Sequence, residues 1–320
     1  MAAWVMLAAS LAAEPAPTPT ARPPTPAVSA GATAIAVQSY APGVRIDWGR
    51  RAVAVDARVV LRKGLLELFA CSPNTREHES ILVVPARPLR IHEALGLVGL
   101  EPGRPPGYDG QRGQGIAASG GALRVVVQYV RDGVEWTAAA EEWVIDRTSN
   151  RSPSTLDFVF AGSRSLDGGS FGADSEGTVI CLVDFDTALV AVGSSHSADN
   201  EQLWLAANTD AIPPVGTTCT MVIRAADYAC AVIALTVVPG GVLREGDRVV
   251  APDAVARKLR AAAMGGQHET LVLRSASDAT VADVRSALNA LTGAGVDPRF
   301  VEVRPPQAKR TEKPSSTPGG

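Results

Sequence analysis

The stretch that decides the first half of the fold runs from Cys71 to Ser80 and reads CSPNTREHES, a polar segment between two apolar runs. Residues 64–70 (GLLELFA) precede it and residues 81–84 (ILVV) follow it, and both runs are typical of strands. A polar segment between two strands is predicted to be a loop held on a rigid sheet, where chemistry is often found. This loop is therefore the first candidate for a functional site.

The loop brings a thiol, an imidazole and a carboxylate together in sequence, from Cys71, His78 and Glu79. All three groups are ligands of zinc or iron, so these residues are candidate ligands of a divalent metal. Adjacent His78 and Glu79 cannot point the same way on a regular strand, so a shared site requires an irregular loop. In that case the imidazole is expected to lower the pKa of the Cys71 thiol and make it the most reactive cysteine. The alternative interpretation is structural, with Glu79 capping backbone N–H groups and His78 fixing the loop by hydrogen bonds.

The remaining cysteines and histidines are expected to be structural. Cys181 lies in an apolar strand and is predicted to be a small core residue. Cys219 and Cys230 either form a bridge in an oxidising compartment or stay as two free thiols. His92, beside the apolar face of its helix, is expected to be structural or exposed. His196 and His268 lie in polar loops, and we expect no cluster of functional groups around them.

Composition excludes several classes of protein. A chain of 320 residues with 46% hydrophobic residues is long enough for two domains, each with a core. The net charge of -3 gives no basic footprint for nucleic acid. The four cysteines are far apart and form no CxxC pair, which excludes an iron–sulfur motif and a four-cysteine zinc ribbon. The sequence also has no nucleotide-binding motif and no G-x-S-x-G motif of a serine hydrolase.

The N-terminus is predicted to direct export. Residues 1–13 form a short apolar run that ends in small residues, as in a signal peptide, although a basic n-region is missing. The run is shorter than the roughly 20 residues that a membrane span needs. Residues 14–34 are a Pro-rich linker, and residues 306–320 are a polar tail predicted to be disordered. We expect a secreted or periplasmic protein with no transmembrane helix in the mature chain.

The fold class is predicted to be α+β, with a β-rich domain over residues 35–226. Alternation over residues 44–55 predicts a hairpin, and Pro88 is expected at the first position of a helix. Residues 102–121 are rich in Gly and Pro and are predicted to be a long irregular loop. Short, frequent strands from residue 156 onward favour a sandwich or an open, layered sheet.

A second domain is predicted over residues 231–305. Its pattern is strand, helix, strand, helix, strand (βαβαβ), which is typical of a small α/β layer. Pro252 is expected to open the first helix. Thr280 is expected to cap the second helix, with Asp283 as the reciprocal partner.

Residues 43–225 resemble the YdjY domain, a family of exported bacterial proteins. The blocks that carry the resemblance are Leu66-Glu67 followed by Cys71, His78-Glu79-Ser80, the helix 91–97, residues 158–163 (FVFAGS), residues 177–181 (GTVIC) and residues 207–214. The resemblance implies no established activity. Some members carry ferredoxin-like labels, which we do not transfer because this chain has no cluster motif.

Residues 237–304 are similar to the periplasmic domain of the ExbD/TolR family. The most telling part is residues 284–303, which contain LNAL and then AGV. Members of that family couple proton flow through a single membrane helix with an acidic residue. This chain has no such helix ahead of the domain, so the similarity implies envelope scaffolding or homodimer formation rather than a motor role.

Together these patterns predict an exported envelope protein that acts as a non-catalytic binding or scaffold module. Its expected partner is an envelope protein or a cell-wall component, and a homodimer through the C-terminal domain is one option. The alternative is a metal-dependent or redox enzyme that uses Cys71, His78 and Glu79. The sequence names neither the ligand nor the oligomeric state.

Overall fold

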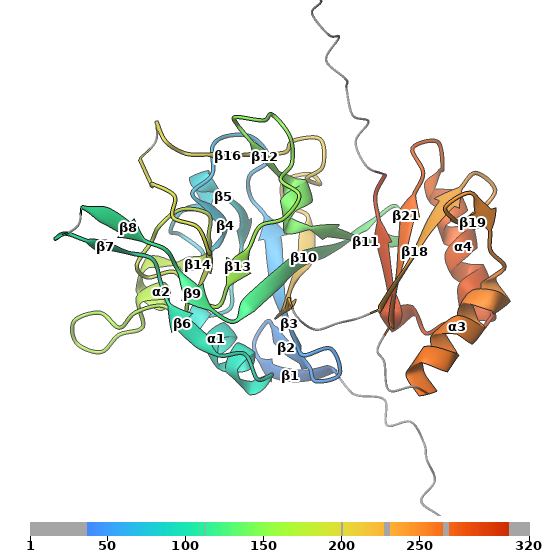
Figure 1. The fold of residues 1–320 in the computed structure, drawn as a ribbon, viewed down its shortest axis with the longest axis horizontal. Helices are drawn as coiled ribbons and strands as arrows, with labels where there is room; N and C mark the ends of the chain where they lie inside the picture. The colour runs from blue at the N-terminus through green and yellow to red at the C-terminus, as the bar shows by residue number, and fades with distance from the viewer. Residues whose placement is uncertain (1–36, 112, 200, 227–230, 265–268, 307–320) are drawn as a thin grey trace, which may run out of the picture. The chain divides into compact units, whose positions relative to one another are not determined.

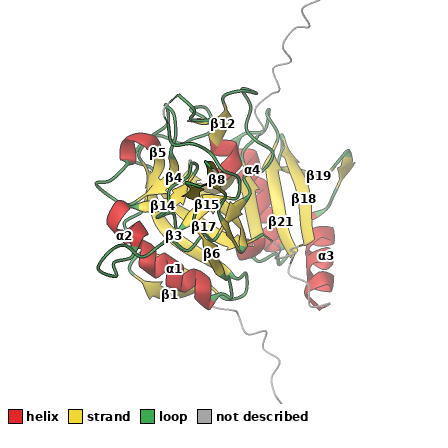
Figure 2. Ribbon diagram, turned by 60° about the vertical axis from the view of Figure 1, so that its left-hand side comes forward, coloured by secondary structure: helices red, strands yellow, loops and turns green. Residues whose placement is uncertain are grey.

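The computed structural model describes residues 37–306 except 112, 200, 227–230 and 265–268 (Figure 1). The predicted signal peptide and linker, and all but the first residue of the predicted tail, lie outside these residues. Strands dominate the described part, which also contains four α-helices (Figure 2). None of its helices has both the length and the apolar character required to cross a membrane.

Eight strands close into a barrel. In hydrogen-bonded order they are β3 (Ala52–Val59), β17 (Thr218–Ala225), β10 (Ala122–Arg131), β13 (Phe158–Val159), β15 (Val190–Val192), β14 (Thr178–Cys181), β4 (Leu68–Cys71) and β5 (Ser80–Val83). The barrel closes because β3 pairs with β17 over most of its length and with β5 at its end, where Arg58 is opposite Val83. The prediction of a β-rich fold is confirmed, but the sandwich or open, layered arrangement was wrong. Short strands separated by turns suit both architectures, and only the pairing of β3 with β5 decides between them.

The barrel interior is filled by alternate residues of its long strands. Val55, Met221 and Val127 lie opposite one another on β3, β17 and β10, and all three are fully buried. Successive side chains of a strand point to opposite faces, so the residues between them face outward. Burying side chains of this size stabilises the fold by roughly 1.5–3 kcal/mol each. The outward residues are consequently free to carry function.

Further strands extend the barrel sheet or lie beside it. They are β1 (Val37–Ala41) and β2 (Val44–Asp47) beyond β3, β11 (Val134–Ala139) beside β10, and the separate pair β12 (Val144–Asp146) and β16 (Leu205–Ala207). The short helical segments are α2 (Gly172–Glu176), η1 (Glu77–Glu79) and η2 (Ala140–Trp143). Helix α1 (Pro88–Leu97) has its proline in the first turn, as predicted, and buries Ile91 and Leu95.

The predicted irregular loop over residues 102–121 was wrong. The segment forms four short strands that pair as β6 (Pro102–Arg104) with β9 (Ser119–Gly120) and β7 (Gly107–Asp109) with β8 (Gln114–Ile116). Gly120 has φ +145°, and a Cβ there would collide with the carbonyl of Phe160. The glycines that look like strand breakers in the sequence therefore allow backbones to cross closely.

The C-terminal part forms a five-stranded sheet in the order β20-β19-β18-β21-β22. Its strands are β18 (Ala231–Val238), β19 (Val242–Glu245), β20 (Arg248–Val249), β21 (Glu269–Ser275) and β22 (Val301–Arg304), with α3 (Pro252–Met264), α4 (Val281–Gly293) and η3 (Pro298–Phe300) between them. Strands β18, β21 and β22 are parallel. Thr280 caps α4 and Asp283 reciprocates, as predicted. That these elements form a separate α/β domain stays a prediction.

Candidate functional site

The loop between β4 and β5 is tightly organised by its own residues. Asn74 has φ +60°, and its backbone N–H donates to the Glu77 carboxylate at 2.6 Å. The Thr75 hydroxyl donates to the backbone carbonyl of Ser72, also at 2.6 Å. The Ser72 N–H donates to the carbonyl of Gly177 at 3.0 Å, which fastens the loop to the start of β14. Local hydrogen bonds of the Glu77 and Thr75 side chains to the backbone thus shape this irregular segment.

Cys71 lies in the interior, at the end of β4. It is fully buried in a small apolar cluster with Leu68, Ala118, Ala161, Cys181, Ala188 and Ala191. Burial raises the pKa of the Cys71 thiol, although hydrogen bonds with Ser80, Arg76 and Thr75 oppose the rise. This direction is opposite to the one expected for a reactive thiol.

His78 and Glu79 diverge from Cys71. The His78 side chain is 74% exposed, and its Nε2 lies 3.7 Å from Oε2 of Glu79. Within the described ranges, no group of three or more His, Cys, Asp or Glu side chains is arranged to hold a metal ion. The structure therefore places one candidate ligand inside and one outside the fold, and metal binding by Cys71, His78 and Glu79 stays a prediction.

Sequence analysis missed a cluster of charged side chains in which Glu67 pairs with Arg76 beside Glu79. Glu67, directly before β4, is buried, and the Arg76 Nη1 atom lies 2.9 Å from its Oε2. Burial raises the pKa of Glu67, hydrogen bonding with Glu79 adds to the rise, and Arg76 opposes it. The Arg76 guanidinium also lies over the ring of Phe185, 4.5 Å from its centroid. A lone acid in the apolar run of residues 64–70 was the available signal, because a buried carboxylate needs a partner.

His196 has partners that its sequence context did not reveal. Its ring stacks on Trp204 with centroids 3.9 Å apart, and its Nε2 lies 2.8 Å from the Ser194 hydroxyl. Burial lowers the pKa of His196. Trp204 follows His196 closely in the sequence, and the expectation that His196 carries no functional constellation stays a prediction. Ser194 is exposed and His196 is half-buried.

The other singled-out residues have structural surroundings. His92 packs edge-on between Phe160 and Phe171, and burial lowers its pKa. Cys181 is fully buried, as predicted. Cys219 is a buried free thiol whose pKa burial raises to about 12. Of the cysteines and histidines named in the sequence analysis, Cys230 and His268 lie outside the described residues.

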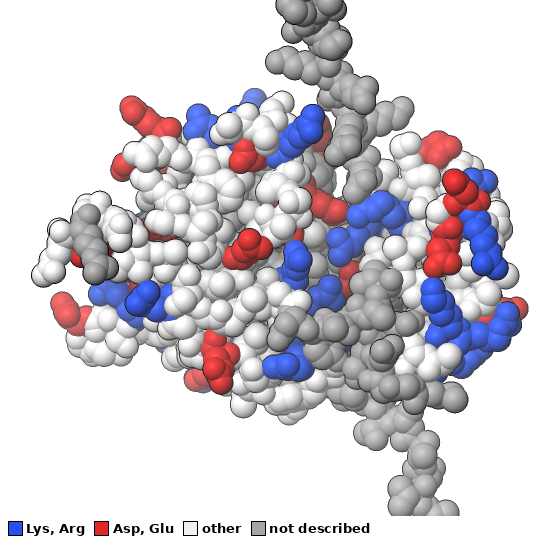
Figure 3. Space-filling model, in the orientation of Figure 1, with Lys and Arg blue, Asp and Glu red and all other residues white. Residues whose placement is uncertain are grey.

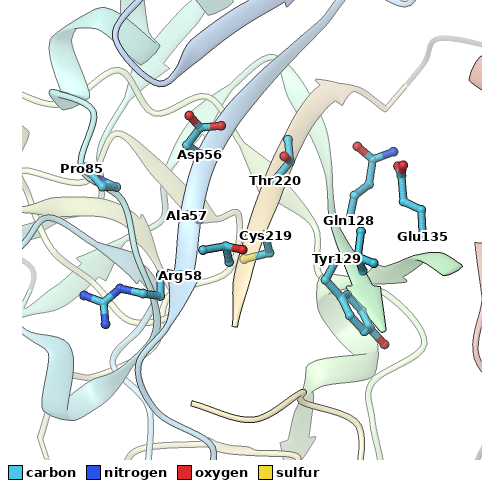
Figure 4. A pocket seen from close by; sticks show the side chains of 11 residues that line it. Asp56, Ala57, Arg58, Pro85, Gln128, Tyr129, Glu135, Cys219 and Thr220 are labelled. Carbon is cyan, nitrogen blue, oxygen red and sulfur yellow. The ribbon is translucent and has the colours of Figure 1, made fainter. Parts of the chain in front are cut away.

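The outer wall of the barrel is hollowed where β3, β17, β10 and β11 lie side by side. The cavity has a volume of about 560 Å³. Its polar lining residues include Asp56, Arg58, Gln128, Glu135, Thr218 and Thr220, and Tyr129 and Cys219 also line it. Figure 4 shows Asp56, Thr220 and Gln128 rising from three neighbouring strands, with Glu135 beside them. No sequence motif marks this cavity, because its residues come from four separate segments.

A family model for the YdjY domain matches residues 44–224, more than half of the 320 residues. The chain belongs to the YdjY domain family. Comparison with curated proteins gave no match, and comparison with solved structures gave none either.

The YdjY domain contains the whole barrel. Its matched span begins at Val44 in β2 and ends at Arg224 in β17, so it includes both the loop at Cys71 and the outer cavity. The predicted YdjY resemblance over residues 43–225 is therefore confirmed. The similarity of residues 237–304 to ExbD/TolR lies beyond the YdjY domain and stays a prediction.

Proposed function

We propose that this chain is a non-catalytic binding protein whose ligand occupies the outer cavity of the YdjY barrel. The observation that carries the proposal is the cavity itself, which combines convergent polar side chains with one exposed valine, Val130. Its volume of about 560 Å³ falls in the range of roughly 300–1,000 Å³ that is usual for ligand sites.

The wall behind this cavity is rigid. Strands β3 and β17 pair continuously from Arg58↔Thr218 to Ala52↔Arg224, and β17 pairs in the same way with β10. Paired strands hold the backbone positions of the lining residues fixed, so little backbone order has to be gained on binding. Acidic and basic side chains are interspersed over the face in Figure 3, so that face presents no large field of one sign. Local hydrogen bonds and single charges are then expected to select the ligand.

The proposal places the protein in the cell envelope, with the C-terminal sheet as a scaffold of the ExbD/TolR type. The apolar N-terminal run supports the envelope location, and the similarity of residues 284–303 supports the scaffold. Arg224 of β17 lies 3.1 Å from Glu302 of β22, whose side chain is buried. A partner held by the C-terminal sheet would thus be coupled to the wall that carries the cavity.

Amide chemical shifts of the ¹⁵N-labelled full chain test the binding function. A panel of short peptides, single amino acids and neutral oligosaccharides is titrated in, and at least one member should shift amides around Thr218 and Gln128. Filling the cavity with Thr218→Trp should abolish the shifts, whereas Thr292→Trp on the exposed face of α4 should not. If no member moves these amides, or if Thr218→Trp leaves the shifts intact, the cavity is not the binding site.

The envelope location has a separate test. Mass spectrometry of protein from the native host should find an N-terminus near Ala12 or Ala13 in the envelope fraction. An intact Met1 in the cytosolic fraction would contradict export.

A further inference from the structure

One row of side chains crosses the cavity at right angles to the strands. Arg58 of β3 is opposite Thr218 of β17, and Val130 of β10 is opposite Glu135 of β11. The ladder between β17 and β10 reaches Cys219↔Tyr129, so its next position sets Thr218 beside Val130. We call these four residues the outer row.

The outer row faces solvent as a continuous set. All four side chains are exposed, and Val130 is 63% exposed. Their neighbours along the four strands point inward and are buried: Ala57, Cys219, Tyr129 and Val134. Across the wall, the outer row therefore presents a cation, a hydroxyl, an apolar group and an anion in that order.

The two charged ends of the outer row are available to a ligand. Among the residues that the structure describes, neither Arg58 nor Glu135 belongs to an ion pair. Asp56, the other carboxylate of the cavity, is already neutralised by Arg45, whose Nη1 lies 2.7 Å from its Oδ1. The cavity thus offers one positive and one negative end.

The spacing of these ends defines a length. Neighbouring strands lie about 4.8 Å apart, so the three steps from β3 to β11 span roughly 14 Å along the wall. An extended peptide advances about 3.4 Å per residue, so roughly four residues cover that span. We infer that the cavity binds a short peptide with free termini, its carboxylate at Arg58 and its ammonium at Glu135. This inference rests on the proposed function, since it names the ligand class of the same cavity.

The chemistry of the outer row favours this ligand over others. A neutral sugar would leave Arg58 and Glu135 without opposite charges, and a polyanion would be repelled by Glu135. A zwitterionic peptide satisfies both ends, while an apolar side chain near its centre packs on Val130. Because exposed ion pairs contribute little, each end is expected to change affinity only about three- to fivefold.

The test uses the tetrapeptide Ala-Ala-Val-Ala with free termini, its N-acetylated form and its C-amidated form. Titration of the full chain, followed by amide shifts, should give the tightest binding for the free peptide and three- to fivefold weaker binding for each blocked form. Arg58→Gln should weaken the free peptide and remove the effect of amidation but keep the effect of acetylation. Glu135→Gln should do the opposite. Arg248→Gln and Glu101→Gln, at exposed positions away from the cavity, are the matched controls.

The outcomes separate the two proposals. If oligosaccharides or single amino acids shift the cavity amides and the tetrapeptide does not, the cavity is a binding site and the peptide inference is wrong. Equal binding of the free and blocked peptides overturns the inference in the same way. If nothing in the panel shifts these amides, the proposed binding function fails together with it.

Discussion

The pair formed by Arg76 and Glu67 allows a direct test that the loop at Cys71 belongs to the fold. The perturbation is Arg76→Ala. It removes the cation from a carboxyl group whose side chain is only 10% exposed and takes the guanidinium off the ring of Phe185. The loop itself keeps its backbone hydrogen bonds, so the effect reports on the buried pair.

The magnitude follows from the two lost contacts. Leaving a mostly buried polar group without its partner costs about 1–3 kcal/mol. Losing a partly exposed cation–π contact costs a further amount of about 0.5–1 kcal/mol. The Arg76 side chain is itself 34% exposed, which moderates both losses, so we expect a loss of about 2 kcal/mol in the free energy of unfolding. For a protein of this size that corresponds to a fall in Tm of roughly 4–8 °C.

The loss should depend on pH. The pKa of Glu67 in the folded protein is raised by burial and by Glu79, so the folded state holds this proton more tightly than the unfolded state. Stability from this group is present below the unfolded pKa and is lost as pH rises through the folded pKa. Arg76 limits that loss by lowering the pKa of Glu67. The variant should therefore show only the smaller loss of about 0.5–1 kcal/mol from the Phe185 contact at about pH 4, where Glu67 is protonated, and its full loss at about pH 7.5.

Urea denaturation of both proteins at the two pH values measures these quantities. Arg164→Ala is the control, because its ion pair with Asp186 has both side chains about half exposed and should matter little. Glu67→Gln combined with Arg76→Ala should recover part of the stability at the higher pH. Equal losses at both pH values, or no loss at either, would refute the assignment of Glu67 as a buried carboxyl that depends on Arg76.

Four other predictions concern the same loop and the C-terminal sheet. Cys71 should react with a thiol reagent only on unfolding, because burial shields it and raises its pKa, and peptide mass spectrometry after pulse labelling should find no effect of His78→Ala; rapid labelling that this variant slows would indicate a reactive site. Elemental analysis of the purified protein tests the metal hypothesis: with Cys71 buried and the His78 side chain exposed we expect a metal-free, folded protein, whereas stoichiometric metal that is lost in His78→Ala would support metal binding. Gly177→Ala should cost at least about 1–2 kcal/mol in thermal unfolding, because Gly177 has φ +74° and a Cβ would collide with the loop, and a neutral effect would show that the loop is loosely held. Residues 231–305 expressed alone, which keep the whole of β18, should unfold cooperatively if they form an independent domain, and a molten fragment would show that they depend on the barrel.

Predictions from local sequence signals hold where one segment contains all the necessary groups. Pro88 opens α1, and Thr280 and Asp283 cap α4, because a helix end is satisfied by residues within a single turn. The hairpin of β2 and β3 follows from alternation within one short stretch. The same locality explains an error: the glycines and prolines of residues 102–121 indicated a loop, whereas close backbone crossing at Gly120 uses them to build paired strands.

The sequence by itself determined the β-rich character of the YdjY domain, the positions of most strands, and the conformational demands of the loop at Cys71. Tertiary structure alone decided that β3 pairs with β5 and closes a barrel, that Cys71 faces inward while His78 faces out, and that Arg58 and Glu135 lie on one row. The physical reason is that propensities and caps depend on neighbours within a few residues. Strand register, burial and shared cavities depend on segments that come together only when the chain folds. The free energy of their packing depends on all of these segments at once, so no single segment reveals it.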